Sequence, residues 1–235
     1  MAGGSKEEAP VGLSHTSFLT RTLTSIVFAV VWMAGTLIGF QYFVLPLLCI
    51  VVAALGLHEF MQLTRRFMPL WAVVLLGFFY LAVPLGCFLG LRSLRLSLAV
   101  TLMLSVWGAD SAAYIFGSTF GRHKLAPKLS PKKSWEGFLA GVVISMLVWV
   151  IVPLLFSLKG WGLSSGLIFG GTVACAGLAG DLLESHLKRR AGVKDAGTIL
   201  PGHGGVLDRF DSLLVAAPVT LLAFGLWTLI RLVRL

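Results

Sequence analysis

Carboxylates and basic residues gather in one polar stretch of the second half of the chain, GDLLESHLKRRAGVKDAGTILPGHGGVLDRFDS. Asp181, Glu184 and Lys188 are spaced i, i+3 and i+7, so they share one face of a helix. A glycine-rich segment, PGHGG, precedes Asp208 and Asp211 at the start of the last apolar run. Oxygen ligands of this kind suit Mg²⁺, which binds a few carboxylates together with substrate phosphates. The stretch therefore predicts a site for a divalent metal and a nucleotide.

A second polar stretch, WGADSAAYIFGSTFGRHKLAPKLSPKKSWEG, lies upstream of the first. Asp110 stands among small residues on an apolar helix, where a charge costs ~2.5–3.5 kcal/mol at mid-membrane. Ser134 is expected to cap the next helix, directly after Lys132 and Lys133. A helix N-terminus beside two lysines suits a polyphosphate, so we interpret this pair as functional. The two lysines of HKLAPK fit phosphate binding and membrane topology equally well.

The composition indicates a membrane protein. Hydrophobic residues make up 57% of the 235 residues and charged residues 12%, about half the charge of a soluble domain. Apolar runs of the ~20 residues needed to cross a bilayer recur along the chain. The net charge of +9 comes from short loops between these runs, where lipid headgroups and phosphorylated small molecules are nearer partners than nucleic acid. The three cysteines form no CxxC pair, so no zinc site is indicated.

Continuous apolar runs predict an all-α polytopic bundle of about seven transmembrane helices. The positive-inside rule puts fourteen of the nineteen Lys and Arg residues on the side of the N-terminus, so the N-terminus and both basic loops are expected to be cytoplasmic. Residues 1–18 are interpreted as a cytoplasmic tail, 19–106 as N-terminal transmembrane helices and 107–235 as a catalytic transmembrane region. The glycine-rich sixth run leaves room for a re-entrant segment. The expected spans are Leu23–Phe40, Phe43–Leu63, Leu70–Leu89, Leu96–Phe116, Ser134–Phe156, Leu163–Leu187 and Asp208–Ile230.

The two polar stretches resemble the phosphatidate cytidylyltransferase (CDP-diacylglycerol synthase) family. The resemblance covers roughly residues 107–212, and its signature meets every fixed position of the family pattern. The upstream family elements are Trp107-x-x-Asp110-x-x-Ala113-Tyr114 and Ser130-Pro131-Lys132-Lys133-Ser134-x-Glu136-Gly137. The downstream elements are Ser185-His-Leu-Lys188-Arg189, Lys194-Asp195, Gly197, Leu200-Pro201, His203-Gly204-Gly205 and Asp208-Arg209-Phe210-Asp211.

The resemblance implies transfer of the cytidylyl group of CTP to phosphatidate, giving CDP-diacylglycerol and pyrophosphate for phospholipid biosynthesis. We assign Mg²⁺, with a second cation left open, to Asp181 and Asp208, and Asp211 as a ligand or a supporting group. The expected catalytic residues are Asp181, Lys188, Arg189, Asp208 and Arg209. The expected substrate-binding residues are Asp110, Ser130, Lys132, Lys133, Ser134, Ser185, Lys194, His203, Gly204 and Gly205.

Two alternatives stay open. One is a CTP-dependent kinase or cytidylyltransferase acting on another lipid. The other is a cation or proton transporter, since intramembrane aspartates also mark ion paths; against it, the acids gather near one membrane face. We expect an integral protein of the bacterial cytoplasmic membrane with its site facing the cytoplasm and no nucleic-acid partner, and the family implies a homodimer. His123 is interpreted as a packing or interface residue, and His203 has a structural turn as its alternative.

Overall fold

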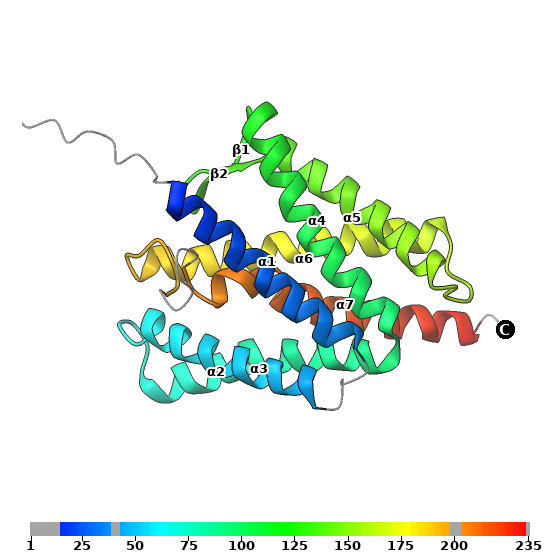
Figure 1. Cartoon of the computed structure of the whole chain (residues 1–235), viewed down its shortest axis with the longest axis horizontal. Helices are drawn as coiled ribbons and strands as arrows, with labels where there is room; N and C mark the ends of the chain where they lie inside the picture. The colour runs from blue at the N-terminus through cyan, green and yellow to red at the C-terminus, as the bar shows by residue number, and fades with distance from the viewer. Residues whose placement is uncertain (1–14, 39–42, 198–203, 234–235) are drawn as a thin grey trace, which may run out of the picture.

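The structure, a computed structural model, describes residues 15–38, 43–197 and 204–233 (Figure 1). Six of its helices, α2 to α7, are long and apolar enough to cross a membrane, and the described apolar part of α1, Ile26–Leu37, is shorter. The chain is an α-helical polytopic membrane protein, as predicted. Its elements are α1 (His15–Leu37), α2 (Val44–Thr64), α3 (Leu70–Leu94), α4 (Leu96–Phe120), β1 (Lys124–Ala126), β2 (Ser130–Ser134), α5 (Trp135–Leu155), α6 (Leu163–Arg190) and α7 (Leu207–Val233).

The helices pack as one bundle in which α6 and α7 are central. Helix α6 packs between α5 and α7, and α7 also contacts α3. Trp32, Phe88 and Phe210 are buried in the core, and the ring of Trp32 lies against both phenyl rings at centroid distances of 5.7 and 4.8 Å. Many large apolar side chains, such as Phe78 and Ile151, instead face outward. Such an apolar exterior fits a protein whose surrounding solvent is lipid.

Both basic loops lie at the same end of the bundle. Figure 1 shows the β1–β2 hairpin, the end of α6 that carries its last basic residues and the turn from α2 to α3 at one end, and the last turns of α7 at the other. The grouping of these loops by the positive-inside rule is therefore confirmed, and the assignment of that side to the cytoplasm stays a prediction.

Helix α6 runs unbroken from Leu163 to Arg190, so the sixth span is not split. The division of the chain at residue 107 stays a prediction.

The first basic loop contains a hairpin that the sequence analysis did not predict. Strands β1 and β2 pair antiparallel, with Lys124 opposite Ser134 and Ala126 opposite Ser130. The pairing covers three and five residues, which is too short for alternation of apolar and polar residues to be recognised. The expected helix cap is confirmed, since Ser134 Oγ accepts a hydrogen bond from the Gly137 amide at 3.2 Å. Strand β2 thus ends directly in the first turn of α5.

Glycines let α5 and α6 approach closely. A Cβ atom added at Gly170 would lie 2.6 Å from the Met146 nitrogen and 2.8 Å from the Ser145 carbonyl carbon. Ser145 Oγ also donates to the Gly170 carbonyl at 2.6 Å. Gly170→Ala is therefore expected to lower the free energy of unfolding by about 1–3 kcal/mol, because two backbones must separate.

Thermal denaturation in detergent measures this effect. Gly225→Ala on α7 is the matched control, because nothing lies within 4 Å of a Cβ atom at that position. We expect the control to keep its melting temperature or to gain stability from the higher helix propensity of alanine. Equal melting temperatures for the two variants would contradict the close helix contact.

Candidate active site

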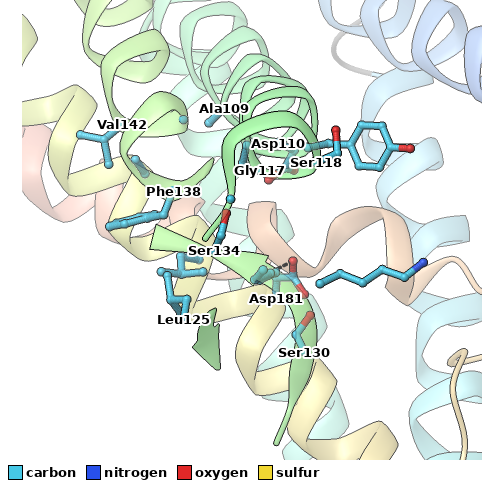
Figure 2. A pocket seen from close by; sticks show the side chains of 18 of the residues that line it. Ala109, Asp110, Gly117, Ser118, Leu125, Ser130, Ser134, Phe138, Val142 and Asp181 are labelled. Carbon is cyan, nitrogen blue, oxygen red and sulfur yellow. Dashed lines mark ion pairs between the residues drawn. The ribbon is translucent and has the colours of Figure 1, made fainter. Parts of the chain in front are cut away.

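A pocket of about 630 Å³ opens between α4, the β1–β2 hairpin, α5 and α6. Figure 2 shows Asp110 from α4, Ser134 from β2 and Asp181 from α6 around it. One wall is apolar and includes Phe138, Val142 and Leu178. The pocket brings together six residues predicted from two separate stretches of the sequence: Asp110, Ser130, Lys132, Lys133, Ser134 and Asp181.

An ion pair between Lys133 and Asp181 joins the hairpin to α6 across this pocket. Both side chains are about a quarter exposed, at 24% and 27%. Ser185 Oγ donates to Asp181 Oδ1 at 3.3 Å. Asp110, which lines the same pocket, interacts electrostatically with Asp181 and Lys133. A basic residue and two carboxylates therefore face one space that a ligand can enter.

The hairpin is held on α5 by Glu136. Its Oε1 atom lies 2.6 Å from His123 Nδ1, and its carboxylate also accepts from the backbone N–H groups of Arg122 and His123 at 3.2 Å. The His123 side chain is 79% exposed, so it is not packed in the protein interior; it contacts α5 through Glu136. Glu136 thus ties the segment just before β1 to the first turn of α5, a role that its position in a helix first turn did not reveal.

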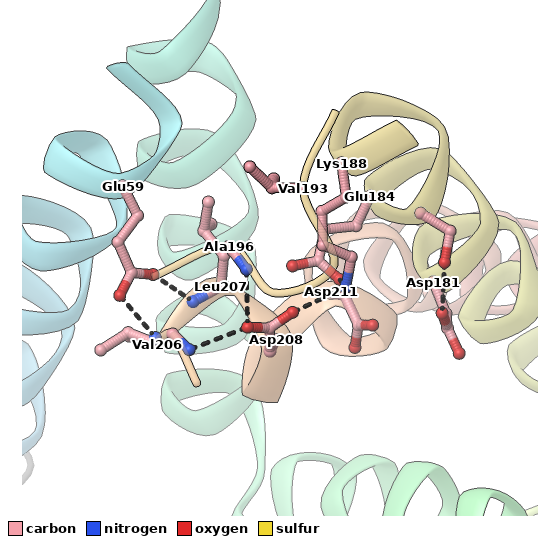
Figure 3. Close-up of polar contacts among 12 residues, drawn as sticks. Glu59, Asp181, Glu184, Lys188, Val193, Ala196, Val206, Leu207, Asp208 and Asp211 are labelled. Carbon is pink, nitrogen blue, oxygen red and sulfur yellow. Dashed lines mark hydrogen bonds and ion pairs between the residues drawn. The ribbon is translucent and has the colours of Figure 1, made fainter. Parts of the chain in front are cut away.

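A second cluster surrounds Lys188 near the end of α6. The ammonium group donates to Glu184 Oε2 at 2.8 Å and to Asp208 Oδ1 at 2.6 Å. The side chains of Lys188, Glu184 and Asp208 are 13%, 1% and 11% exposed. Asp208 Oδ2 accepts from the amides of Ala196 at 3.0 Å and Gly205 at 2.8 Å (Figure 3). The shared helix face predicted for Glu184 and Lys188 is thus used in a buried ion-pair network.

Asp211 connects the two clusters. Its carboxylate interacts electrostatically with those of Asp181, Glu184 and Asp110, and Glu184 Oε1 is buried without a hydrogen-bond partner. Two ammonium groups, Lys133 and Lys188, pair with carboxylates in these clusters. The carboxylates outnumber them, being Asp110, Asp181, Glu184, Asp208 and Asp211. Glu184 is the almost fully buried carboxylate of this set, at 1% exposure, and a buried negative charge is costly unless cations compensate it.

Carboxylate oxygens, which these residues supply, are of the ligand type that Mg²⁺ binds. Within the described ranges, no three His, Cys, Asp or Glu side chains form a ready-made metal site. Mg²⁺ does not need one, because it keeps several waters and is bound through one or two carboxylates and the phosphates of a substrate. The oxygens of Asp208 already accept three hydrogen bonds from protein groups. The assignment of Asp181, Asp208 and Asp211 as ligands stays a prediction.

Other predicted residues lie outside the pocket lining. Arg189 donates from Nε to the Leu129 carbonyl at 3.2 Å and from Nη1 to the Val193 carbonyl at 3.3 Å, so it joins the hairpin turn to the end of α6. Arg209 lines a small cavity between α1, α4 and α7. Lys194 is exposed, and His203 lies outside the described residues. The catalytic and binding roles of these side chains stay predictions.

Sequence reasoning missed Glu59. The residue is fully buried on α2, and its two carboxylate oxygens accept the amides of Val206 and Leu207, each at 2.9 Å. The available signal was its type, because it is the one acidic residue in the α2 sequence and a charge inside a membrane needs a partner. Its partners, almost 150 positions away, could not be read from that signal.

Comparison with known proteins places the chain in a family. The model of the cytidylyltransferase family matches residues 70–227. A phosphatidate cytidylyltransferase of Rickettsia felis is 36% identical over 184 residues, which cover 74% of this chain and 80% of the relative. Proteins of the same name from Staphylococcus haemolyticus and Pseudomonas aeruginosa are 41% and 46% identical over 63% and 52% of this chain. The chain spans about half the length of these two relatives, 56% and 45%. It belongs to the cytidylyltransferase family.

Proposed function

We propose that this protein transfers the cytidylyl group of CTP to phosphatidate and releases pyrophosphate. The observation that carries the proposal is the pocket, which combines lysines and carboxylates with an apolar wall between membrane helices. Lysines suit phosphate groups, and an apolar wall suits the part of a lipid next to its headgroup. The two substrates, CTP and phosphatidate, are taken from the names of the family and of the relatives.

In the proposed reaction an oxygen of the phosphatidate phosphate attacks the α-phosphorus of CTP. A new P–O bond forms as the bond to the leaving pyrophosphate breaks. Both reactants are anions, so the task of the protein is mainly alignment and charge neutralisation. Lys132 and Lys133 line the pocket and would receive phosphate oxygens. Lys188 holds Asp208 against the glycine-rich segment.

Mg²⁺ belongs to the proposal as the cofactor. Asp181, Asp208 and Asp211 would hold it, and Asp110, which lines the same pocket, would be the further carboxylate available to a second cation. When bound, the metal supplies neutralisation of the negative charge on the reacting phosphates. Because the phosphatidate nucleophile is already ionised, no side chain is required to remove a proton from it.

Location and assembly complete the proposal. The chain is an integral membrane protein, and we place it in the bacterial cytoplasmic membrane with the pocket facing the cytoplasm. The bacterial relatives and the basic loops at one end of the bundle support this orientation, since cytoplasmic loops carry an excess of Lys and Arg. The homodimer implied by the family resemblance stays a prediction, which the mass of the detergent-solubilised protein tests.

Removal of Mg²⁺ is the first test of this function. Purified protein in detergent, given CTP and phosphatidate, is expected to form CDP-diacylglycerol and pyrophosphate in equal amounts with Mg²⁺. Turnover should fall to background when EDTA removes the metal, and should return when Mg²⁺ is added back. The products are measured by lipid mass spectrometry and a pyrophosphate assay.

The outcomes separate the alternatives. CTP binding without phosphatidate turnover would point to another lipid, and polyprenol and ether-lipid substrates would be tested next. A protein that neither binds nor consumes CTP would contradict the enzymatic proposal. Ion flux in reconstituted liposomes would then test the transporter alternative.

A further inference from the structure

The carboxylate of Glu59 lies where three parts of the chain meet. Glu59 belongs to α2, while its hydrogen-bond donors are Val206, the residue directly before α7, and Leu207, the first residue of α7 (Figure 3). The first amides of a helix have no partner within the helix, and a negative charge at this end is favoured by the helix dipole. Each Glu59 oxygen accepts a hydrogen bond from one amide, so both oxygens are needed to satisfy the two N–H groups.

Glycines on either side of residues 198–203 pack directly on this carboxylate. A Cβ atom added at Gly197 would lie 2.5 Å from Glu59 Oε1, and one at Gly205 would lie 2.6 Å from Oε2. A Cβ atom at Gly205 would also lie 2.8 Å from the Gly197 nitrogen. Only residues without a side chain fit here, so Glu59 touches the chain both before and after the segment 198–203.

Asp208 holds the same two parts of the chain from the opposite side. Its Oδ2 atom accepts from Ala196 and from Gly205, and its Oδ1 atom receives Lys188. Asp208 thus accepts a hydrogen bond from the Gly205 amide, and Glu59 accepts hydrogen bonds from the next two amides, those of Val206 and Leu207. A displacement of the start of α7 would move Asp208 with it.

We propose that Glu59 is a positioning residue of the cytidylyl transfer. It fixes Gly205 and the start of α7, and through them Asp208 and Lys188, in the arrangement that receives the phosphates of the nucleotide. Its link to turnover rests on the proposed function, whereas its hold on α7 does not. Glu59 itself is fully buried and acts through the backbone.

Amide hydrogen exchange of the full-length protein in detergent tests the hold on α7 without any assay of activity. Glu59→Gln keeps the size of the side chain and replaces one acceptor oxygen by an NH₂ group, which cannot accept. Exchange at Val206 and Leu207 is expected to rise about tenfold or more relative to the middle of α7, because a hydrogen bond to a charged group is lost. Leu45→Ala, a fully buried position of the same helix, is the control that weakens packing and leaves this ratio unchanged.

Turnover distinguishes positioning from packing. Glu59→Asp is smaller but keeps two acceptor oxygens, so it should retain more activity than Glu59→Gln; a role in packing alone predicts the reverse order. We expect kcat/KM for CTP to fall about tenfold in Glu59→Gln, with the KM for phosphatidate unchanged.

The exchange experiment and the turnover experiment test different claims, so one can fail without the other. If the wild type does not turn over CTP, the proposed function falls and the exchange ratio still decides whether Glu59 holds α7. If Glu59→Gln does not fold, Gly197→Ala takes its place in the exchange experiment, because its Cβ atom would lie 2.5 Å from Glu59 Oε1 and displace the carboxylate; an exchange ratio equal to that of the wild type would overturn the inference. Equal exchange in folded Glu59→Gln, or activity above that of Glu59→Asp, would overturn it as well.

Discussion

Asp181→Asn is expected to lower CTP-dependent turnover by about a thousandfold, the size of effect seen when a group that stabilises transition-state charge is removed. Asp181 faces the pocket beside Lys133, within electrostatic range of Asp110 and Asp211. Asparagine keeps the shape and loses the charge that a divalent cation requires. The initial rate of CDP-diacylglycerol formation at saturating Mg²⁺ measures the effect.

The fold should survive this change. The Lys133–Asp181 pair is about a quarter exposed on each side, and ion pairs with access to solvent contribute only ~0–1 kcal/mol. The melting temperature of Asp181→Asn in detergent is therefore expected to stay near that of the wild type. A variant that melts normally and keeps more than a tenth of the wild-type rate would remove Asp181 from the proposed metal ligands.

Lys188→Met is expected to have the largest effect on stability. Lys188 compensates Glu184 and Asp208 at once, and Glu184 is almost fully buried. Removing one partner of a buried ion pair typically costs ~3–5 kcal/mol, because the other charge stays behind unpaired. Loss of the lysine also releases Asp208 Oδ1, so turnover should fall together with the melting temperature.

Two further variants show whether unpaired charge is the cause. Lys159→Met removes an exposed lysine in the connection between α5 and α6, and we expect it to change neither stability nor turnover. Adding Glu184→Gln to Lys188→Met removes one of the stranded charges and should recover part of the lost stability. No recovery in the double variant, measured by thermal denaturation, would contradict the role assigned to Lys188.

Local spacing predicted what lies along a single helix. The seven apolar runs correspond to the seven described helices, with shifted ends: the first was predicted to begin at Leu23 and α1 begins at His15. Ser134 caps α5 as expected from its position before Glu136 and Gly137. These features depend on neighbours within one or two turns, which a sequence displays directly.

Contacts between distant segments were harder to predict from the sequence. The residue types and intramembrane cost of Asp110 and Asp181 marked them as site residues, and the pocket brings them together. Nothing local shows that Glu59 reaches α7 or that Arg209 lines a cavity near α1. Such placements depend on which helices become neighbours, which a pattern within one segment does not contain.

The ion pair between Lys133 and Asp181 makes the two proposed ligands thermodynamically linked. A phosphate that takes Lys133 as its partner frees the carboxylate of Asp181 for a cation, and a cation at Asp181 frees Lys133 for a phosphate. Each proposed ligand would therefore raise the affinity for the other, and reciprocity requires the same factor in both directions. Nucleotide and metal would therefore bind this pocket cooperatively. The coupling would come from the hairpin, which carries Lys133, and from α6, which carries Asp181.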